Sequence, residues 1–163
     1  NAVHAVMQHI RFDRCDSAQA VELEINRMKD ECLISSDAAK LVDPGMIWDF
    51  FATDIGLRLR SSQSVVREFK FSILDDAAKY GEHLDGEKIL LQGVVDCAMI
   101  EPDGITVLDF KTDRVSEDTL EITADTYRPQ VIAYAQALSR IYEKKIKTAQ
   151  LYFFKLNKFV TVI

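Results

Sequence analysis

The sequence is poor in the residues that build disulfide-stabilised, collagen-like and disordered proteins. Its 163 residues contain six Gly, three Pro and three Cys. The cysteines, Cys15, Cys32 and Cys97, are odd in number and far apart, so they match neither a disulfide framework nor a zinc site. They fit a reducing, cytoplasmic compartment best, and without a fourth cysteine the chain is not expected to hold an iron–sulfur cluster alone.

Two further absences concern membranes and motors. No stretch approaches the roughly 18 apolar residues that a membrane-spanning helix requires. No GxxxxGKS/T loop is present, so the chain encodes no ATP-driven motor. It begins with Asn1 instead of Met and lacks a signal-peptide pattern, which suggests a piece of a larger protein.

What is present fits one globular domain over residues 1–163. Hydrophobic residues make up 48% of the chain, enough for a sizeable core. The net charge of −6 argues against nucleic-acid binding through a basic surface. That objection is weak for an enzyme that holds a divalent cation in carboxylates, because the cation supplies positive charge where a phosphate lies.

Apolar residues recur at intervals of three and four through residues 1–60, which predicts a helical N-terminal part. One stripe contains Val3, Val6, Met7 and Ile10, and a second contains Ala20, Val21, Leu23, Ile25 and Met28. Residues 37–42 form a short helical piece. Asp43 followed by Pro44 predicts the start of a further helix that continues through Leu59.

From residue 64 to residue 163 the pattern indicates strands around one helix. Strands are expected at 65–73, 88–100 and 105–111, and residues 101–104, with the sequence Glu-Pro-Asp-Gly, predict a tight turn between the last two. The three strands should form an antiparallel meander.

A helix is expected from about Thr126 to Tyr142, with Pro129 in its first turn. Its apolar side would consist of Ile132, Ala135, Leu138 and Ile141. The tail, 148–163, returns to a strand pattern with a turn at Asn157-Lys158. The whole order predicts one mixed α/β domain.

The most informative residues are Asp96, Asp109 and Lys111. Adjacent strands joined by a tight turn would bring Asp96 and Asp109 together, and residues two apart on a strand, such as Asp109 and Lys111, share a face. A Mg²⁺ or Mn²⁺ ion would remove the repulsion between two close carboxylates, and a lysine beside it can orient or deprotonate an attacking water. The alternative is a cross-strand salt bridge between Asp96 and Lys111 on a solvated sheet face.

Three separated segments resemble a known family. Asp96, the segment 108–113 (Leu-Asp-Phe-Lys-Thr-Asp) and the segment 127–134 (Tyr-Arg-Pro-Gln-Val-Ile-Ala-Tyr) are similar, in this order, to the RecB-type branch of the PD-(D/E)XK nucleases. Within it the match is to the C-terminal nuclease domains of AddA-type helicase–nuclease subunits. Residues 4–9 resemble the helical histidine motif that opens this module. The resemblance implies a restriction-endonuclease-like α/β fold, with a central mixed sheet flanked by helices and a catalytic core over about 64–163.

The resemblance also assigns site residues. The metal ligands would be His4, Asp96, Asp109 and the backbone carbonyl of Phe110. Lys111 would be the catalytic lysine, and Gln130 with Tyr134 would support the active site and contact DNA. Glu68 lies where related nucleases often carry an acidic residue on the first strand.

Each assignment has a purely structural alternative. A lone helical histidine such as His4 is often a satisfied structural group. Gln130 and Tyr134 share one helix face, which by itself is typical of core packing. Glu68 alternates with Phe69 and Phe71, so a solvated strand face explains it equally well.

The function implied by the resemblance is Mg²⁺-dependent hydrolysis of DNA, with Mn²⁺ as the alternative ion. The domain would belong to a bacterial, cytoplasmic helicase–nuclease that processes double-strand break ends for recombinational repair. Its partners would be single strands released by the helicase, the helicase part of the same polypeptide and an AddB-like subunit, with no membrane. Two alternatives stay open: an inactive nuclease fold that guides DNA, and a free-standing RecB-type exonuclease.

Overall fold

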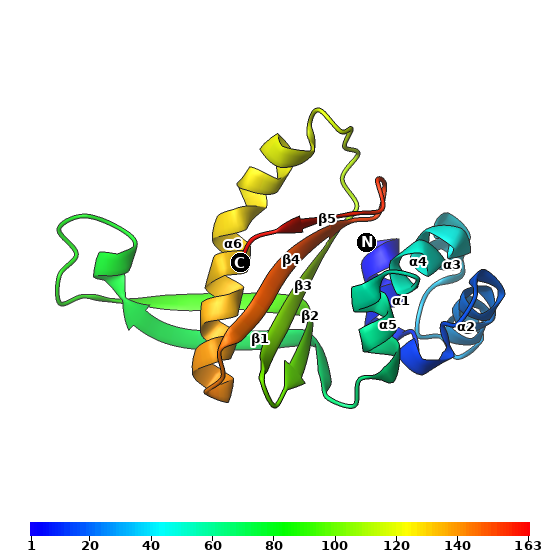
Figure 1. Cartoon of the computed structure of the whole chain (residues 1–163), viewed down its shortest axis with the longest axis horizontal. Helices are drawn as coiled ribbons and strands as arrows, with labels where there is room; N and C mark the ends of the chain where they lie inside the picture. The colour runs from blue at the N-terminus through cyan, green and yellow to red at the C-terminus, as the bar shows by residue number, and fades with distance from the viewer.

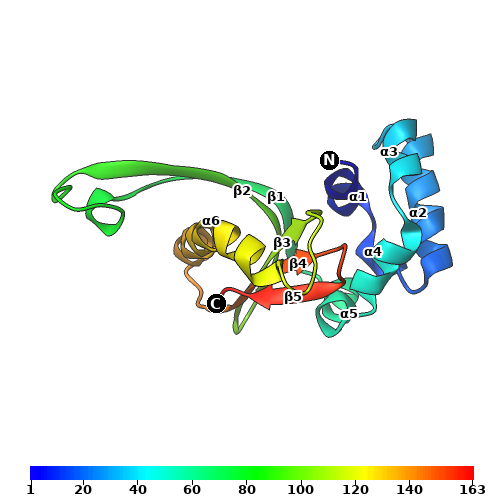
Figure 2. The same ribbon diagram turned by 90° about the horizontal axis from the view of Figure 1, so that it is seen from above.

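Helices α1 to α5 lie on the side of one face of a five-stranded sheet, with α2 and α3 on the outside of this group, and helix α6 lies against the other face (Figures 1 and 2). The structure is a computed structural model that describes residues 1–163. The mixed sheet flanked by helices confirms the expected fold class and the helical N-terminal part.

Each α-helix of the N-terminal part begins at a side chain that caps it. The elements are α1 (Ala2–His9), the 3-10 helix η1 (Phe12–Arg14), α2 (Ala18–Asp30), α3 (Ser36–Leu41), α4 (Pro44–Phe51) and α5 (Asp54–Ser61). The α-helix caps are Asn1, Ser17, Ser35, Asp43 and Thr53, and each accepts a hydrogen bond from a first-turn amide. The caps therefore fix where each helix starts.

The single helix expected from Pro44 through Leu59 is wrong, because the chain forms two helices that meet at Thr53. The Thr53 hydroxyl donates to the Phe50 carbonyl (2.6 Å) and accepts from the Gly56 amide (3.0 Å), so it ends α4 and caps α5. Gly56 lies so close to α4 that a Cβ there would be 2.2 Å from the Phe50 carbonyl oxygen. Only glycine allows the two helices to pack at this corner.

The sheet has the order β1–β2–β3–β4–β5. Its strands are β1 (Val65–Asp76), β2 (Lys88–Glu101), β3 (Gly104–Lys111), β4 (Ile146–Phe153) and β5 (Lys158–Thr161). All neighbours are antiparallel except β3 and β4, which are parallel and joined through α6. The predicted meander and the turn between β2 and β3 are confirmed.

The last turn lies earlier than expected. Its residues are 154–157, and Lys158 already belongs to β5. Asn157 has a φ of 50°, in the left-handed region that Asn tolerates better than most residues, so it ends the turn instead of beginning it.

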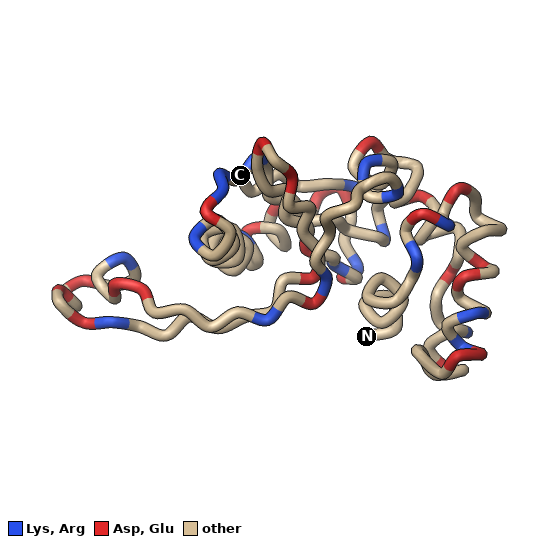
Figure 3. The backbone as a smooth tube through the Cα atoms, turned by 90° about the horizontal axis from the view of Figure 1, so that it is seen from below, with Lys and Arg blue, Asp and Glu red and all other residues tan.

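Strands β1 and β2 extend far beyond the rest of the sheet. They pair from Val65↔Met99 to Asp76↔Lys88, whereas β3 pairs with β2 only up to Cys97↔Leu108. Residues 69–95, the part of these two strands that does not have β3 as a neighbour, form a projecting ribbon that we call the arm (Figure 2). Its tip, around the 3-10 helix η2 (Ala77–Lys79), carries charges of both signs (Figure 3).

Helix α6 (Leu120–Tyr142) begins before the expected Thr126, so Pro129 lies in its interior and not in its first turn. An interior proline costs a helix about 3 kcal/mol. Burial of Leu120 and Ala124 against the sheet offsets that cost and extends the helix. None of the helices is long and apolar enough to cross a membrane.

Three residues expected on buried helix faces are exposed: Leu23 (71%), Ile132 (38%) and Ile141 (42%). At about 100° per residue, positions nine apart lie on opposite sides of a helix, so Ile132 and Ile141 do not share a face. The buried side of α6 contains Ala135 and Leu138, as predicted, and also Val131 and Tyr134 in place of the two isoleucines.

The sheet separates two hydrophobic cores, and β3 contributes to both. Leu108 and Phe110 pack with the N-terminal helices, and Val107 packs with α6. Because side chains alternate along a strand, Asp109 and Lys111 lie on the face of Val107, as the sequence predicted. The acidic and basic groups at the end of β3 thus lie where the apolar layer under α6 ends.

Candidate active site

Asp96 and Asp109 lie opposite each other on β2 and β3. Cys97 pairs with Leu108 at the end of the ladder, so the next position of each strand brings the two carboxylates together. Their side chains are only 14% and 5% exposed, respectively. The Phe110 amide donates a 2.8 Å hydrogen bond to Asp96 Oδ2 and so fixes the orientation of that carboxylate.

Lys111 lies next to the two acids. Its Nζ lies 2.8 Å from Asp109 Oδ2 as an ion pair. The same ammonium lies 3.8 Å from the centre of the Tyr127 ring, a cation–π contact. The Tyr127 hydroxyl donates to Asp113 Oδ1 (2.9 Å), which holds the ring in place. The salt bridge considered for Lys111 is therefore made to Asp109 and not to Asp96.

His4 reaches this group from the other side of the sheet. Its Nε2 lies 2.8 Å from the Phe110 carbonyl oxygen and 3.3 Å from Asp96 Oδ2. Its Nδ1 lies 2.9 Å from Asn1 Oδ1, which also caps α1 by accepting from the His4 amide (3.0 Å). The Asn1 amide group donates to Thr112 Oγ1 (2.9 Å), so the start of α1 is tied to the residue after β3.

The electrostatics of the three groups differ according to their neighbours. Burial and the charge of Asp96 raise the pKa of Asp109 to about 6, although Lys111 opposes the shift. Burial acts to raise the pKa of Asp96 too, but the hydrogen bonds from His4 and from the Phe110 amide outweigh it and lower that pKa. The hydrogen bond with Asp96 raises the pKa of His4 despite burial. An imidazolium that donates from both ring nitrogens fits the contacts of His4.

Glu68 lies on β1 beside these residues. The ladder between β1 and β2 includes Arg67↔Cys97 and Phe69↔Val95 but skips Glu68, whose φ is 47°. Burial and the charge of Asp96 raise the pKa of its half-buried carboxyl. A left-handed residue in a strand is uncommon outside glycine, and here it lies across from the carboxylate of Asp96.

Tyr134 and Gln130 come from α6. Tyr134 is buried and meets the Phe71 ring edge-on at 5.8 Å, whereas Gln130 is exposed. Burial, and the charges of Asp109 and Asp96, raise the pKa of the Tyr134 phenol. The ring packs over Gly93, where a Cβ would lie 2.6 Å from Tyr134 Cε1. Tyr134 therefore belongs to the core below the carboxylates, and Gln130 lies at its open edge.

The residues present fit a divalent cation. Asp96 and Asp109 place two buried carboxylates side by side, and the charge of Asp96 raises the pKa of Asp109, so a further cation beside the pair would relieve their repulsion. Two carboxylates, a carbonyl oxygen and an imidazole form a donor set suited to Mg²⁺ or Mn²⁺. The structure contains no preformed cluster of three or more acidic, histidine or cysteine side chains arranged around a metal. Instead His4 contacts Phe110 and Lys111 contacts Asp109, so these contacts must open for a cation to enter.

The site opens into a cavity of about 320 Å³. It is lined by Asn1, His4, Phe110, Lys111, Thr112, Asp113 and Tyr127. A larger cavity, of about 660 Å³, lies between the arm and α6, and none of the predicted site residues lines it. Of the predicted site residues, His4, Phe110 and Lys111 line the smaller cavity, whereas Asp96 and Asp109 do not.

The sequence alone indicated no role at the site for Asn1, Gly93, Tyr127 and Asp113. Tyr127 lies one helical turn before Gln130, and Gly93 precedes Asp96 by three positions, so both spacings were visible. Their contacts with Lys111 and Tyr134 depend on the packing of α6 on the sheet, which no local pattern encodes. The role of Asn1 depends likewise on α1 lying across the end of β3.

Comparisons with known proteins agree with this geometry. The family model described as the PD-(D/E)XK nuclease superfamily matches residues 1–161. Among curated proteins, a subunit of an ATP-dependent helicase/nuclease from Bacillus mycoides is 34% identical over 174 residues, covering 99% of this chain and 14% of the relative. The equivalent subunits are similar in Clostridium botulinum, strain Langeland (32% identical, 98% of this chain, 13% of the relative), and in Bacillus cereus, strain AH820 (33%, 99% and 14%). The chain thus spans about one-seventh of these relatives, and the resemblance inferred from its motifs is confirmed.

Proposed function

The chain belongs to the PD-(D/E)XK nuclease superfamily, and from that premise we propose that it hydrolyses DNA phosphodiester bonds with Mg²⁺, as the nuclease domain of a helicase–nuclease. The observation that carries the proposal is the convergence of two buried carboxylates, Asp96 and Asp109, with the Lys111 ammonium 2.8 Å from Asp109 Oδ2. A buried pair of acids beside an ammonium is poorly suited to a merely structural role.

The residues that would hold the ion are Asp96, Asp109, His4 and the Phe110 carbonyl. When bound, Mg²⁺ neutralises charge on the phosphate and makes water a better nucleophile, and Mn²⁺ can do the same. In its absence His4 holds its place through Asn1 Oδ1 and Phe110. Release of the Nε2 proton frees the imidazole to accept a cation.

Lys111 acts on the reacting groups themselves. Its ammonium is held between Asp109 and the Tyr127 ring and lines the cavity, where the phosphate would bind. There the ammonium would orient the attacking water or stabilise the negative charge that develops on phosphorus, and the neutral amine, once it has lost its own proton, could instead deprotonate the water. Water oxygen forms the new bond to phosphorus and gives up a proton, the bond from phosphorus to the leaving deoxyribose oxygen breaks, and that oxygen takes up a proton. Gln130, at the open edge of α6, would contact the DNA strand, and Tyr134 would support the floor below it.

The biological setting is proposed from the names of the relatives. Those proteins are helicase/nuclease subunits, and the present chain corresponds to a small part of each. We place the domain in a bacterial, cytoplasmic enzyme that processes double-strand break ends for recombinational repair. The helicase part of the same polypeptide would deliver single strands to it, and an AddB-like subunit would be its partner.

An inactive, DNA-guiding fold is the main alternative, and a free-standing exonuclease is another. All three groups of the candidate centre, Asp96, Asp109 and Lys111, are present and brought together, which favours an active enzyme. Exonuclease activity is tested with linear single-stranded DNA against a covalently closed single-stranded circle of the same sequence. The proposal expects Mg²⁺-dependent loss of the linear strand only. Cutting of the circle would contradict an exonuclease, and no cutting of either would contradict an active isolated domain.

A further inference from the structure

Helix α1, which carries His4, ends against two arginines that lie outside the helix. Because α1 ends at His9 and the Ile10 amide bonds back to the Val6 carbonyl, the carbonyls of Met7, Gln8 and His9 have no amide partner within the helix. Such carbonyls need other donors when they are partly buried. Here all three find an arginine.

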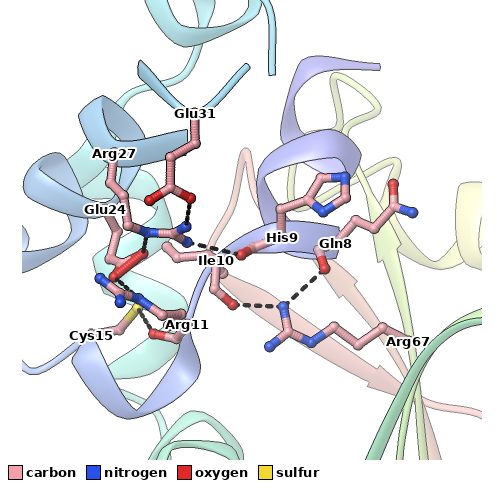
Figure 4. A network of polar contacts seen from close by, with 9 residues as sticks. All are labelled: Gln8, His9, Ile10, Arg11, Cys15, Glu24, Arg27, Glu31 and Arg67. Atoms are coloured by element: carbon pink, nitrogen blue, oxygen red, sulfur yellow. Dashed lines mark hydrogen bonds and ion pairs between the residues drawn. The ribbon is translucent and has the colours of Figure 1, made fainter. Parts of the chain in front are cut away.

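Arg67, on β1, provides most of these donors (Figure 4). Its Nη1 donates to the carbonyl oxygens of Ile10 (2.6 Å), Gln8 (3.0 Å) and Met7 (3.1 Å), so three acceptors share the two hydrogens of one nitrogen. The guanidinium carbon lies 3.6 Å from the centre of the Phe12 ring. The charge is therefore held between a helix C-terminus and an aromatic face, both of which favour a cation.

Arg27, on α2, provides the remaining donor, to the His9 carbonyl at 3.2 Å. The charge of Arg27 is neutralised by two ion pairs, from Nε to Glu24 Oε2 (2.9 Å) and from Nη1 to Glu31 Oε2 (2.7 Å). The buried Glu24 also forms an ion pair through Oε1 with Arg11 Nε (2.7 Å) (Figure 4). Arg67 forms no ion pair of this kind. Burial lowers the pKa of its guanidinium. A partly buried cation that has no carboxylate partner lowers the stability of a fold, so a contribution to stability does not by itself explain Arg67.

The backbone of Arg67 lies next to the candidate metal centre. Arg67 pairs with Cys97, the residue after Asp96, so it sits on the strand beside one of the carboxylates. Its side chain reaches the end of α1 opposite to His4. A helix of eight residues is about 12 Å long, and a small tilt at one end displaces the other. Arg67 thus sets the position of α1 relative to the strand that carries Asp96.

We propose that Arg67 is a positioning residue for His4: by binding the C-terminal carbonyls of α1 it holds the imidazole against Phe110 and Asp96. This inference rests on the proposed function, since it gives His4 the role of a metal ligand. Groups that orient a ligand without touching the metal typically change metal affinity by about 10- to 100-fold when replaced. Arg67 acts through the whole helix, so we expect the lower end of that range.

The test is a double-mutant cycle on the 163-residue chain, read by calorimetric titration with Mn²⁺. Arg67→Met keeps an unbranched apolar side chain but removes the donors and the guanidinium that lies over Phe12, and Arg67→Lys keeps a charged donor. Each is measured alone and together with His4→Ala. Arg140→Gln is the matched control, because Arg140 also ties two elements by donating to a backbone carbonyl, that of Leu74, but contacts neither α1 nor the centre.

The proposal expects Arg67→Met to weaken Mn²⁺ binding about tenfold in the unsubstituted chain and less than about twofold when His4 is already absent. Arg67→Lys should keep more affinity than Arg67→Met, and it carries the same comparison if Arg67→Met fails to fold. A merely structural role would lower stability without changing Mn²⁺ affinity, or would lower affinity equally in both backgrounds. Either result overturns the proposal.

A second measurement separates this proposal from the proposed function. If the unsubstituted chain binds no Mn²⁺, the proposed function fails, and the His4 imidazole resonances of the metal-free protein decide about Arg67. Resonances that move in Arg67→Met but not in Arg140→Gln support the positioning role. Resonances that stay in place in a folded Arg67→Met chain overturn it.

Discussion

The imidazole Nε2 of His4 lies 2.8 Å from the backbone carbonyl oxygen of Phe110, a residue 106 positions later in the chain. This contact joins α1 to the end of β3 and places two of the four expected metal ligands against each other. Both must turn toward a cation when one binds. The contact therefore connects metal uptake with the protonation of His4.

The first prediction concerns that proton. Because Asp96 raises the pKa of His4 above its usual 6.5, more than half of the rings are protonated at pH 6.5, and a metal must displace the Nε2 proton. Mn²⁺ binding should release this proton, and titration calorimetry in buffers of different ionisation enthalpy measures it. His4→Gln should release fewer protons and bind at least about tenfold more weakly. His9→Gln, on the same helix but outside the site, is the control, and an identical loss there would contradict the assignment.

The second prediction concerns stability and Asp109. Its pKa is raised from 3.8 to about 6, so ionisation destabilises the metal-free fold above pH 6, by about 3 kcal/mol. Asp109→Asn should increase the free energy of unfolding at pH 8 by about 1–3 kcal/mol. The gain should shrink as pH falls from 6 and vanish below 4, where the carboxyl is protonated in both folded and unfolded chains. Urea unfolding at several pH values measures this, and a large loss of stability at pH 8 would count against the site.

The same substitution should abolish metal binding. Asp109→Asn removes the negative charge of one of the two paired carboxylates, so Mn²⁺ should no longer stabilise the fold against urea. Asp113→Asn, which changes a nearby acid that binds the Tyr127 hydroxyl, should keep that stabilisation. Equal loss in both variants would show that general negative charge, and not this centre, attracts the ion.

We expect the ring of Tyr127, and not its hydroxyl, to affect the rate of cleavage. Because the ring face holds the Lys111 ammonium at 3.8 Å, Tyr127→Leu should slow cleavage by about tenfold, the rate equivalent of a cation–π contact of 1–2 kcal/mol. Tyr127→Phe keeps the ring and loses only the hydrogen bond to Asp113, so its rate should stay within about twofold. Single-turnover rates at saturating Mg²⁺ measure both. A Phe variant as slow as the Leu variant would assign the effect to the hydroxyl instead.

The sequence was informative where neighbours in space are near in the chain. A tight turn after Glu101 was enough to place Asp96 opposite Asp109, because register follows from the turn. Alternation along β3 placed Asp109 and Lys111 on one face for the same reason. That His4, near the start of the chain, would lie at the site was predicted only from the resemblance to a nuclease family.

The rest depended on packing between distant elements. The break at Thr53 and the early start of α6 were missed, because a capping hydroxyl and a buried Leu120 outweighed a continuous helical pattern and an interior proline. The contacts of Tyr127 with Lys111 and of Arg67 with α1 join residues on separate elements. No local periodicity predicts which long side chain will contact a separate helix or strand.

We propose that Lys111 cleaves DNA together with Asp96 and Asp109. The most direct measurement is hydrolysis of end-labelled linear single-stranded DNA by the chain with Mg²⁺, with chelator, and by Lys111→Ala, with Lys158→Ala as a lysine control from β5. We expect Mg²⁺-dependent cutting that Lys158→Ala retains and Lys111→Ala lowers by about 10²- to 10⁴-fold, while Lys111→Ala still binds Mn²⁺. Cutting that persists in Lys111→Ala at the full rate would contradict this proposal.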